Sequence, residues 1–221
     1  MDRIPFDAYD FFGYLASGLL VIVGMDLVLG FPPVLGKGFG AIEGAILVMA
    51  IYVVGQVIAT PAKALLEDGL IGRLLGRPSV NLFRDKKPRL IGLIFPGYFL
   101  PLPEQTRRKI LQKAQTEGIT GTGEDLFLAV RYNPAVLQDQ KLMDKLNSFL
   151  NKYGFNRNLS FAALVVGIAL LGKFRFSHQA NPDLIKYAIA DLIAAVLLLY
   201  RYLKFFRQYS YEMFNAYGRA K

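Results

Sequence analysis

The chain has 221 residues, 53% of them hydrophobic, and a formal net charge of +9. It contains no cysteine, which excludes disulfides and cysteine-based metal sites or nucleophiles, and its single histidine, His178, excludes the two-histidine sites of zinc enzymes. His178 falls in a hydrophilic turn, where we expect it to be solvated. No catalytic constellation is evident elsewhere, so we expect a protein that is not an enzyme and uses no cofactor or metal ion.

Four apolar segments organise the chain, at residues 9–31, 39–62, 159–171 and 184–206. The first, YDFFGYLASGLLVIVGMDLVLGF, exceeds the roughly 20 apolar residues that cross a hydrocarbon core, and it ends before Pro32. The third is short, so we expect it to begin near Phe155 as the continuation of a preceding helix. Buried helices of soluble proteins can be equally apolar, but four of them in one small chain favour a membrane protein. We therefore predict an all-α membrane protein with four transmembrane helices in two hairpins.

A polar block between the hairpins divides the chain into three predicted parts. These are a first hairpin at residues 1–64, a basic cytoplasmic module at 65–154, and a second hairpin with a cytoplasmic tail at 155–221. Residues 63–158 hold 16 Lys or Arg against 9 Asp or Glu. Cap residues and proline spacing predict a mostly helical module, with helices near 104–116, 124–132 and 137–153. Short strands are an alternative for the sequence RLIGLIF at 89–95.

The distribution of Lys and Arg predicts the topology. The two termini and the polar module carry 22 of these residues, whereas the turns on the opposite side carry 4. By the positive-inside rule, both termini and the module are cytoplasmic. The first ten residues lack the cationic region of a cleavable signal peptide, so we expect the first apolar segment to stay in the mature protein.

Three carboxylates fall inside the predicted spans: Asp26, Glu43 and Asp191. The topology places all three in the outer half of the bilayer, where carboxylates brought together by a symmetric homo-oligomer, most simply a tetramer, form a cation path. The plainer alternative is that Glu43 extends to the headgroups and that Asp26 or Asp191 pairs with a nearby lysine. For Asp26 and Asp191 we favour a polar path or a polar contact between helices, and we leave both interpretations open for Glu43.

Small residues indicate where the predicted helices can approach one another. The spacing of Gly36, Gly40 and Gly44 matches the pattern in which every fourth residue is small. The first segment contains Gly13, Ser17 and Gly24, which also permit close helix contacts.

Two basic clusters mark the cytoplasmic module: Arg84, Lys86, Lys87 and Arg89, followed by Arg107, Arg108, Lys109 and Lys113. The aromatic residues Tyr98 and Phe99 lie between them. Cationic side chains can bind phosphates, and aromatic rings can stack on bases. This combination is typical of sites for single-stranded nucleic acid or a nucleotide. The turn at residues 120–123, TGTG, adds a candidate anion cradle ahead of a helix, although it lacks the Lys-Ser/Thr of a P-loop. Attraction of the clusters to anionic lipid of the inner leaflet is the plainer explanation and the one that we favour, ahead of a nucleic-acid or nucleotide ligand, and a protein partner is a third.

The arrangement of these parts resembles a known group of proteins. Two spans, a basic module and two further spans, with LIGRLLGRPSVNLF after the second span and NKYGFNRNLSFA entering the third, resemble small membrane effectors of bacterial anti-phage defence operons. The effector of Hailong-type systems is most similar, and the membrane protein of Kiwa-type defence is similar on the same grounds. The resemblance implies a bacterial inner-membrane location, a partner nucleotidyltransferase, and a channel-like protein that a DNA oligomer holds shut.

Two functional hypotheses follow. In the first, an anionic ligand of the basic module controls the opening of an oligomeric, cation-permeable channel, because it binds the closed and open forms with different affinity. In the second, the protein is a non-conducting membrane scaffold or sensor that recruits a soluble defence partner. Ion flux through the reconstituted protein separates the two.

Overall fold

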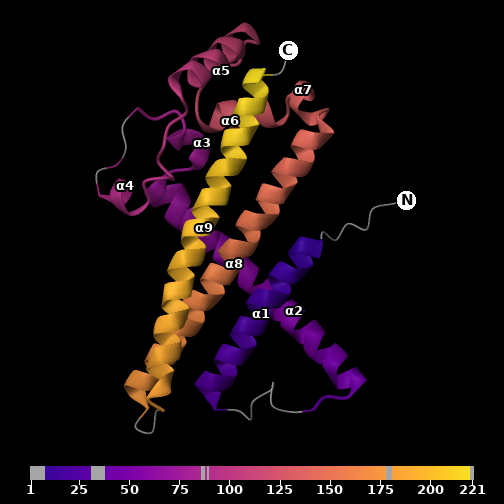
Figure 1. Ribbon diagram of the computed structural model, residues 1–221, viewed down its shortest axis with the longest axis vertical. Coiled ribbons are helices and arrows are strands. Elements are labelled where there is room, and N and C mark those ends of the chain that lie inside the picture. The colour runs from indigo at the N-terminus through magenta and orange to yellow at the C-terminus, as the bar shows by residue number, and fades with distance from the viewer. Residues whose placement is uncertain (1–7, 31–37, 86–87, 89, 178–180, 220–221) are drawn as a thin grey trace. The chain divides into compact units, whose positions relative to one another are not determined.

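The computed structural model describes residues 8–30, 38–85, 88, 90–177 and 181–219. Its helices are α1 (Ala8–Leu29), α2 (Ala41–Ala62), η2 (Lys63–Leu75), α3 (Pro78–Asn81), α4 (Ile91–Ile94), α5 (Glu104–Thr116), α6 (Glu124–Arg131), α7 (Pro134–Leu137), α8 (Gln140–Phe176) and α9 (Asp183–Arg219) (Figure 1). The described residues contain no strand, which confirms the all-α prediction. The alternative of strands near residues 89–95 is wrong, because Ile91–Ile94 forms one helical turn.

Three stretches of helix are long and apolar enough to cross a membrane: Phe11–Leu29, Ala41–Asn81 and Gln140–Phe176. The last of these confirms that the third apolar segment continues a preceding helix. The fourth predicted segment, residues 184–206, is helical but does not belong to this set. Lys186, Asp191, Arg201 and Lys204 interrupt it, so every 18-residue stretch of α9 carries more than two charged residues.

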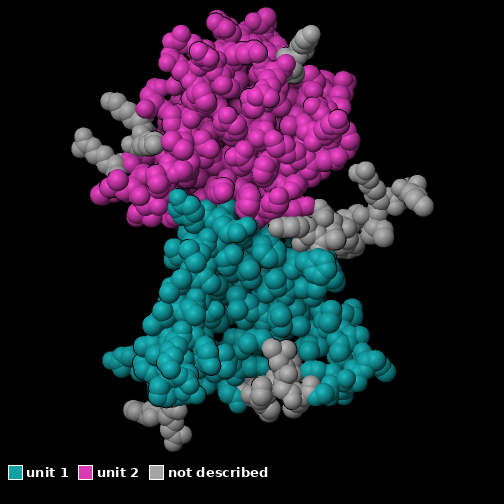
Figure 2. Space-filling model, in the orientation of Figure 1, with its two compact units in different colours: residues 1–68, 154–202 teal, residues 69–153, 203–221 magenta. Residues whose placement is uncertain are grey.

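The chain divides into two compact units (Figure 2). Unit 1 comprises residues 1–68 and 154–202, and unit 2 comprises residues 69–153 and 203–221. The C-terminal part of α9 thus belongs to the same unit as the polar middle of the chain, whereas the sequence grouped it with the second hairpin. The reason is packing: Met213, Phe214 and Tyr217 are buried in the core of unit 2.

In unit 1, α1 and α2 cross each other (Figure 1), and a glycine in each helix lets the two backbones come into contact at the crossing. A β-carbon on Gly18 would lie 1.8 Å from the Ile51 carbonyl oxygen, and one on Gly55 would lie 1.9 Å from the Tyr14 carbonyl oxygen. By contrast, a β-carbon on Gly44 would meet no atom within 4 Å. The predicted glycine series at residues 36, 40 and 44 therefore does not form the contact between α1 and α2 at Gly44. Its first member, at residue 36, lies outside the described residues.

The other helices of unit 1 also meet at small residues. A β-carbon on Gly24 of α1 would lie 2.4 Å from Val166 Cγ1 of α8, and one on Gly167 of α8 would lie 2.9 Å from Leu192 Cγ of α9. The Ser160 hydroxyl donates a hydrogen bond to the Ala195 carbonyl oxygen at 2.8 Å, again between α8 and α9. Close packing plus interhelical hydrogen bonds is how helices associate in lipid, so these contacts suit a membrane environment.

The chain leaves α2 through η2, a π-helix of 13 residues. Pro61 lies in the last turn of α2, where its ring removes a backbone donor and crowds the preceding turn, which accounts for the change of helix type at this point. The buried residues Ala62, Leu66, Ile71 and Leu75 are spaced four, five and four apart. This spacing matches a helix whose hydrogen bonds run from i to i+5, so it brings all four to one face. In an α-helix the first pair and the second pair would face opposite sides.

Unit 2 has a hydrophobic core built from short helices around the end of α9. The Phe214 ring packs edge-on against Phe83 at 4.9 Å and against Phe127 at 5.8 Å between ring centroids. Fully buried Leu82, Ile110 and Leu126 complete the centre of this core. Residues from the polar middle of the chain and from the end of α9 therefore fold together in this unit.

Candidate anion-binding surface

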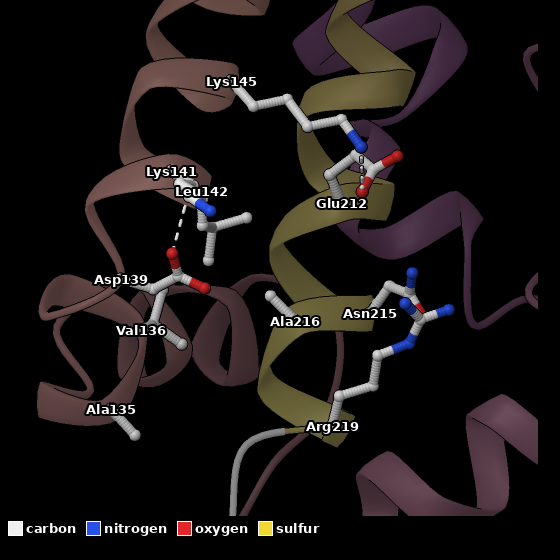
Figure 3. Close-up of a pocket in the computed structure, with 10 residues that line it drawn as sticks. All are labelled: Ala135, Val136, Asp139, Lys141, Leu142, Lys145, Glu212, Asn215, Ala216 and Arg219. Carbon is white, nitrogen blue, oxygen red and sulfur yellow. Dashed lines mark hydrogen bonds and ion pairs between the residues drawn. The ribbon is translucent and has the colours of Figure 1, made fainter.

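The last turns of α9 line two pockets in unit 2. The larger, of about 420 Å³, is bounded by α7, the first turns of α8, and α9 (Figure 3). Its lining residues are Ala135, Val136, Asp139, Lys141, Leu142, Lys145, Glu212, Asn215, Ala216 and Arg219. The smaller, of about 230 Å³, is lined by Gln105, Thr106, Lys109, Asn215, Gly218 and Arg219. Because both contain Asn215 and Arg219, the two pockets adjoin along α9.

Close packing holds this part of α9 in place. A β-carbon on Gly218 would lie 3.0 Å from Ile110 Cγ1, so the glycine lets α9 approach α5. The adjacent Tyr217 donates a hydrogen bond to Glu117 at the end of α5, at 2.8 Å. Burial and this carboxylate raise the pKa of Tyr217 above its ordinary value, so the phenol remains neutral and donates at physiological pH. Arg219 is thus carried by a well-anchored helix.

Both carboxylates of the larger pocket are already engaged. Glu212 forms an ion pair with Lys145 at 2.9 Å, and Asp139 accepts a hydrogen bond from the Leu142 backbone amide at 3.0 Å, where it caps the start of α8 (Figure 3). The capping carboxylate keeps its charge, so the lining of the larger pocket holds three cations, Lys141, Lys145 and Arg219, against these two carboxylates.

Three cations around the pockets remain without an ion pair among the described residues: Lys109, Lys141 and Arg219. Asn215, whose side chain lies beside Arg219 in Figure 3, adds amide donors. Arginine offers a planar fork of donors to phosphate or carboxylate, and lysine supplies a point charge. The volume of the larger pocket falls within the range of about 300–1,000 Å³ that is typical of small-molecule sites. The surface suits an anionic ligand, and we call it the α9 surface.

Most of the sequence-predicted basic residues of α5 are occupied elsewhere. Arg107 pairs with Asp85, and Arg108 pairs with Glu104 one turn earlier. Lys113 lies 3.7 Å from a Glu117 oxygen and sits 4.8 Å from the centre of the Tyr217 ring. From the second predicted cluster, Lys109 lines the smaller pocket.

Only one member of the first predicted cluster, Arg84, lies within the described residues. Arg84 is exposed, and its charge acts on the buried Tyr98. Its other three members, Lys86, Lys87 and Arg89, lie outside the described residues.

The predicted stacking residues are wrong. Tyr98 and Phe99 are only 4% and 3% exposed, and their rings pack edge to face at 5.2 Å, so neither presents a face to a base. The Tyr98 hydroxyl donates a hydrogen bond to the Gly76 carbonyl oxygen at 2.8 Å. Burial raises the pKa of Tyr98 above its ordinary value, despite the opposing influence of Arg84. The aromatic residues between the basic clusters are core residues.

The TGTG turn is not an open anion cradle either. A β-carbon on Gly121 would lie 3.4 Å from an Asp125 carboxylate oxygen, so a carboxylate of the chain itself lies against the turn. The next residue after the turn, Glu124, pairs with Arg77 at 2.6 Å and accepts a hydrogen bond from the Ser79 hydroxyl. These carboxylates leave the turn electrostatically unfavourable for phosphate.

The three predicted path residues lie on three different helices of unit 1. Asp26 of α1 and Asp191 of α9 are half-buried. Glu43 is exposed and accepts a hydrogen bond from the Gly40 amide at 3.0 Å, which caps α2. Within the described residues, no group of three or more Asp, Glu or His is arranged to hold a metal ion, so one chain does not assemble these carboxylates into an ion site.

Comparison of the chain with protein-family models, with curated proteins and with solved structures finds no match. The function must therefore be argued from the site. Sequence analysis missed Lys141, Asn215 and Arg219, which come from distant segments. The available signal was the continuation of large apolar residues beyond residue 206, up to Phe214 and Tyr217, which predicts that this part of α9 packs on something.

Proposed function

We propose that this chain is a membrane effector whose unit 2 binds an anionic ligand at the α9 surface, and that ligand binding controls an ion path formed by a homo-oligomer. The observation that carries the proposal is the set of three cations, Lys109, Lys141 and Arg219, which lie beside two adjoining pockets and form no ion pair with any residue that the structure describes. A single-stranded DNA oligomer or a nucleotide supplies the phosphates that such a surface fits. The resemblance to anti-phage effectors supports the same ligand class, four bilayer crossings, cytoplasmic termini and a bacterial inner-membrane location.

Two features of unit 1 support the ion path. Asp26 and Asp191 are half-buried on α1 and α9, helices that pack with α8 in unit 1. Ionisable groups at membrane depth are costly unless they face a helix bundle or a water-filled path. One chain does not enclose such a path, so several copies, most simply a tetramer, are needed to complete it.

Ligand binding is tested with the full chain in nanodiscs and a fluorescently labelled single-stranded deoxyoligonucleotide, followed by anisotropy. Combined reversal of Lys109, Lys141 and Arg219 to Glu is expected to weaken binding at least about 100-fold, because three phosphate contacts are lost. Arg108→Glu is the control for Lys109→Glu alone, since it makes the same two-unit charge change one position earlier on α5, at a residue already paired with Glu104, and it should weaken binding at most about threefold. Unchanged binding by the triple variant would refute the α9 surface.

The ion path is tested separately by dye-reported flux in proteoliposomes. Asp26→Asn and Asp191→Asn should reduce ligand-dependent cation flux, whereas Asp183→Asn, an exposed residue paired with Lys186, should not. Intact ligand binding with no flux from the wild-type protein would refute the channel and support the alternative, a non-conducting scaffold or sensor that recruits a soluble partner.

A further inference from the structure

Several large apolar side chains in the segment around α4 are exposed. Leu90 and Leu93 are each 79% exposed, and Ile94 is 65% exposed. Three such residues within five positions form a local apolar patch of the kind that marks an interaction site. The patch is not part of the α9 surface, because none of its residues lines either pocket.

The segment is fixed to the core of unit 2 directly after the patch. Tyr98 and Phe99 are buried, the Tyr98 hydroxyl bonds to the Gly76 carbonyl oxygen, and the Leu102 amide donates to the Leu82 carbonyl oxygen at 2.9 Å. The exposed side chains are therefore presented by an anchored loop rather than by a loose end.

Charge in the flanking sequence indicates what the patch contacts. The six residues from Arg84 to Arg89 contain four cations and one carboxylate, and that carboxylate, Asp85, pairs with Arg107. A short apolar stretch that follows several cations in the sequence has the composition of a segment that lies in the interface of an anionic bilayer, where apolar side chains enter the acyl boundary and cations meet lipid headgroups.

We propose that residues 90–94 are a lipid-docking segment that inserts Leu90, Leu93 and Ile94 into the headgroup region of an anionic leaflet. Unit 2 is joined by continuous helix to candidate membrane spans, because α8 runs through Gln140–Phe176 and α2 continues into η2. A segment tethered to a membrane experiences a high effective concentration of lipid, so three apolar side chains are sufficient for docking.

The absence of tryptophan from the chain gives a direct test. Leu93→Trp introduces a single reporter in the patch, and Tyr132→Trp introduces one at a 69% exposed position of unit 2 as the control. Each full-length variant is reconstituted in nanodiscs, and its fluorescence is measured with and without brominated lipid. Leu93→Trp should emit at shorter wavelength and be quenched at least about twofold more than the control, and more strongly in anionic than in zwitterionic lipid.

Three results would overturn the proposal. Equal quenching of Leu93→Trp and Tyr132→Trp would show that the patch does not reach lipid. A blue-shifted Leu93→Trp that brominated lipid does not quench would show that protein, such as a second copy, covers the patch. Quenching that is independent of lipid charge would remove the role of the cations. Leu90→Trp provides a second reporter if Leu93→Trp does not fold.

Discussion

Arg157 of α8 lies 2.6 Å from Glu67 of η2, and their side chains are only 14% and 21% exposed. The same guanidinium also donates two hydrogen bonds to Asn158 Oδ1, at 3.1 and 3.2 Å. Removal of one partner leaves the other charge buried without compensation, which is costly.

We therefore expect Glu67→Gln to lower the free energy of unfolding by about 3 kcal/mol, and Arg157→Gln to do the same. The double variant should lose less than the sum of the two single variants by more than about 1 kcal/mol, because the residues interact directly. Thermal unfolding in detergent measures these effects. Disruption of the exposed pair Lys186–Asp183 by Asp183→Asn is the control and should cost less than about 1 kcal/mol. Additive effects of the two single variants would show that the pair contributes no coupling.

The crossing of α1 and α2 predicts a second pattern. Gly18→Ala or Gly55→Ala would place a β-carbon within 2 Å of a backbone oxygen, so the helices must separate, at a cost of about 2 kcal/mol or more. Gly44→Ala, in the same helix as Gly55, meets open space and should be neutral or slightly stabilising, because alanine is the better helix former. Equal melting temperatures for Gly55→Ala and Gly44→Ala would contradict the crossing.

Tyr98 predicts a pH dependence. Its pKa is raised in the folded protein by burial, whereas an unfolded tyrosine ionises near pH 10. Above about pH 10 the unfolded state therefore loses a proton that the folded state keeps, and the free energy of unfolding falls as the pH rises. In Tyr98→Phe the fall in the free energy of unfolding should be shallower between about pH 9.5 and 11. At neutral pH this variant should lose about 1 kcal/mol of unfolding free energy, because the hydrogen bond to Gly76 is missing. The exposed Tyr132→Phe is the control and should keep the wild-type slope; an unchanged slope in Tyr98→Phe would refute the assignment.

The core of unit 2 predicts a large effect at the end of α9. Phe214→Ala should lower the free energy of unfolding by about 3–5 kcal/mol, since the ring is fully buried between Phe83 and Phe127. Limited proteolysis of the full chain should then cut within residues 69–153. Leu128→Ala, at a 45% exposed position of α6, should leave the cleavage pattern unchanged. Resistance of Phe214→Ala to the protease would place α9 outside this core.

Local signals allowed much of the helical fold to be predicted. Pro103 before α5 and Gly118 after it mark its ends, and α5 begins and ends where the sequence predicts. The absence of proline between Gln140 and Phe176 allows α8 to continue as one helix. The π-helix could not be predicted in this way. Apolar residues that are four, five and four positions apart do not fall on one face when the α-helical period of about 3.6 residues is assumed.

The α9 surface could not be predicted from the sequence, for a different reason. Lys109, Lys141 and Arg219 come from α5, α8 and α9, and only long-range packing brings them together. Sequence analysis assigned the end of the chain to a cytoplasmic tail of the second hairpin, because aromatic residues after an apolar helix occur both at a membrane interface and in a protein core. Of the clustered charges near residue 107, Arg107 and Arg108 pair with Asp85 and Glu104, whereas Lys109 lines the smaller pocket, a difference that the sequence alone does not show.

The participation of Phe214 and Tyr217 in the core of unit 2 also constrains biosynthesis. Residues 69–153 leave the ribosome well before the end of α9 is translated, so their hydrophobic core lacks a central helix until the last segment of α9 emerges. Until then the nascent chain exposes the apolar surface that Phe214 and Tyr217 cover in the finished unit. The finished unit thus forms only once translation has passed residue 217, which couples its folding to completion of the preceding helices.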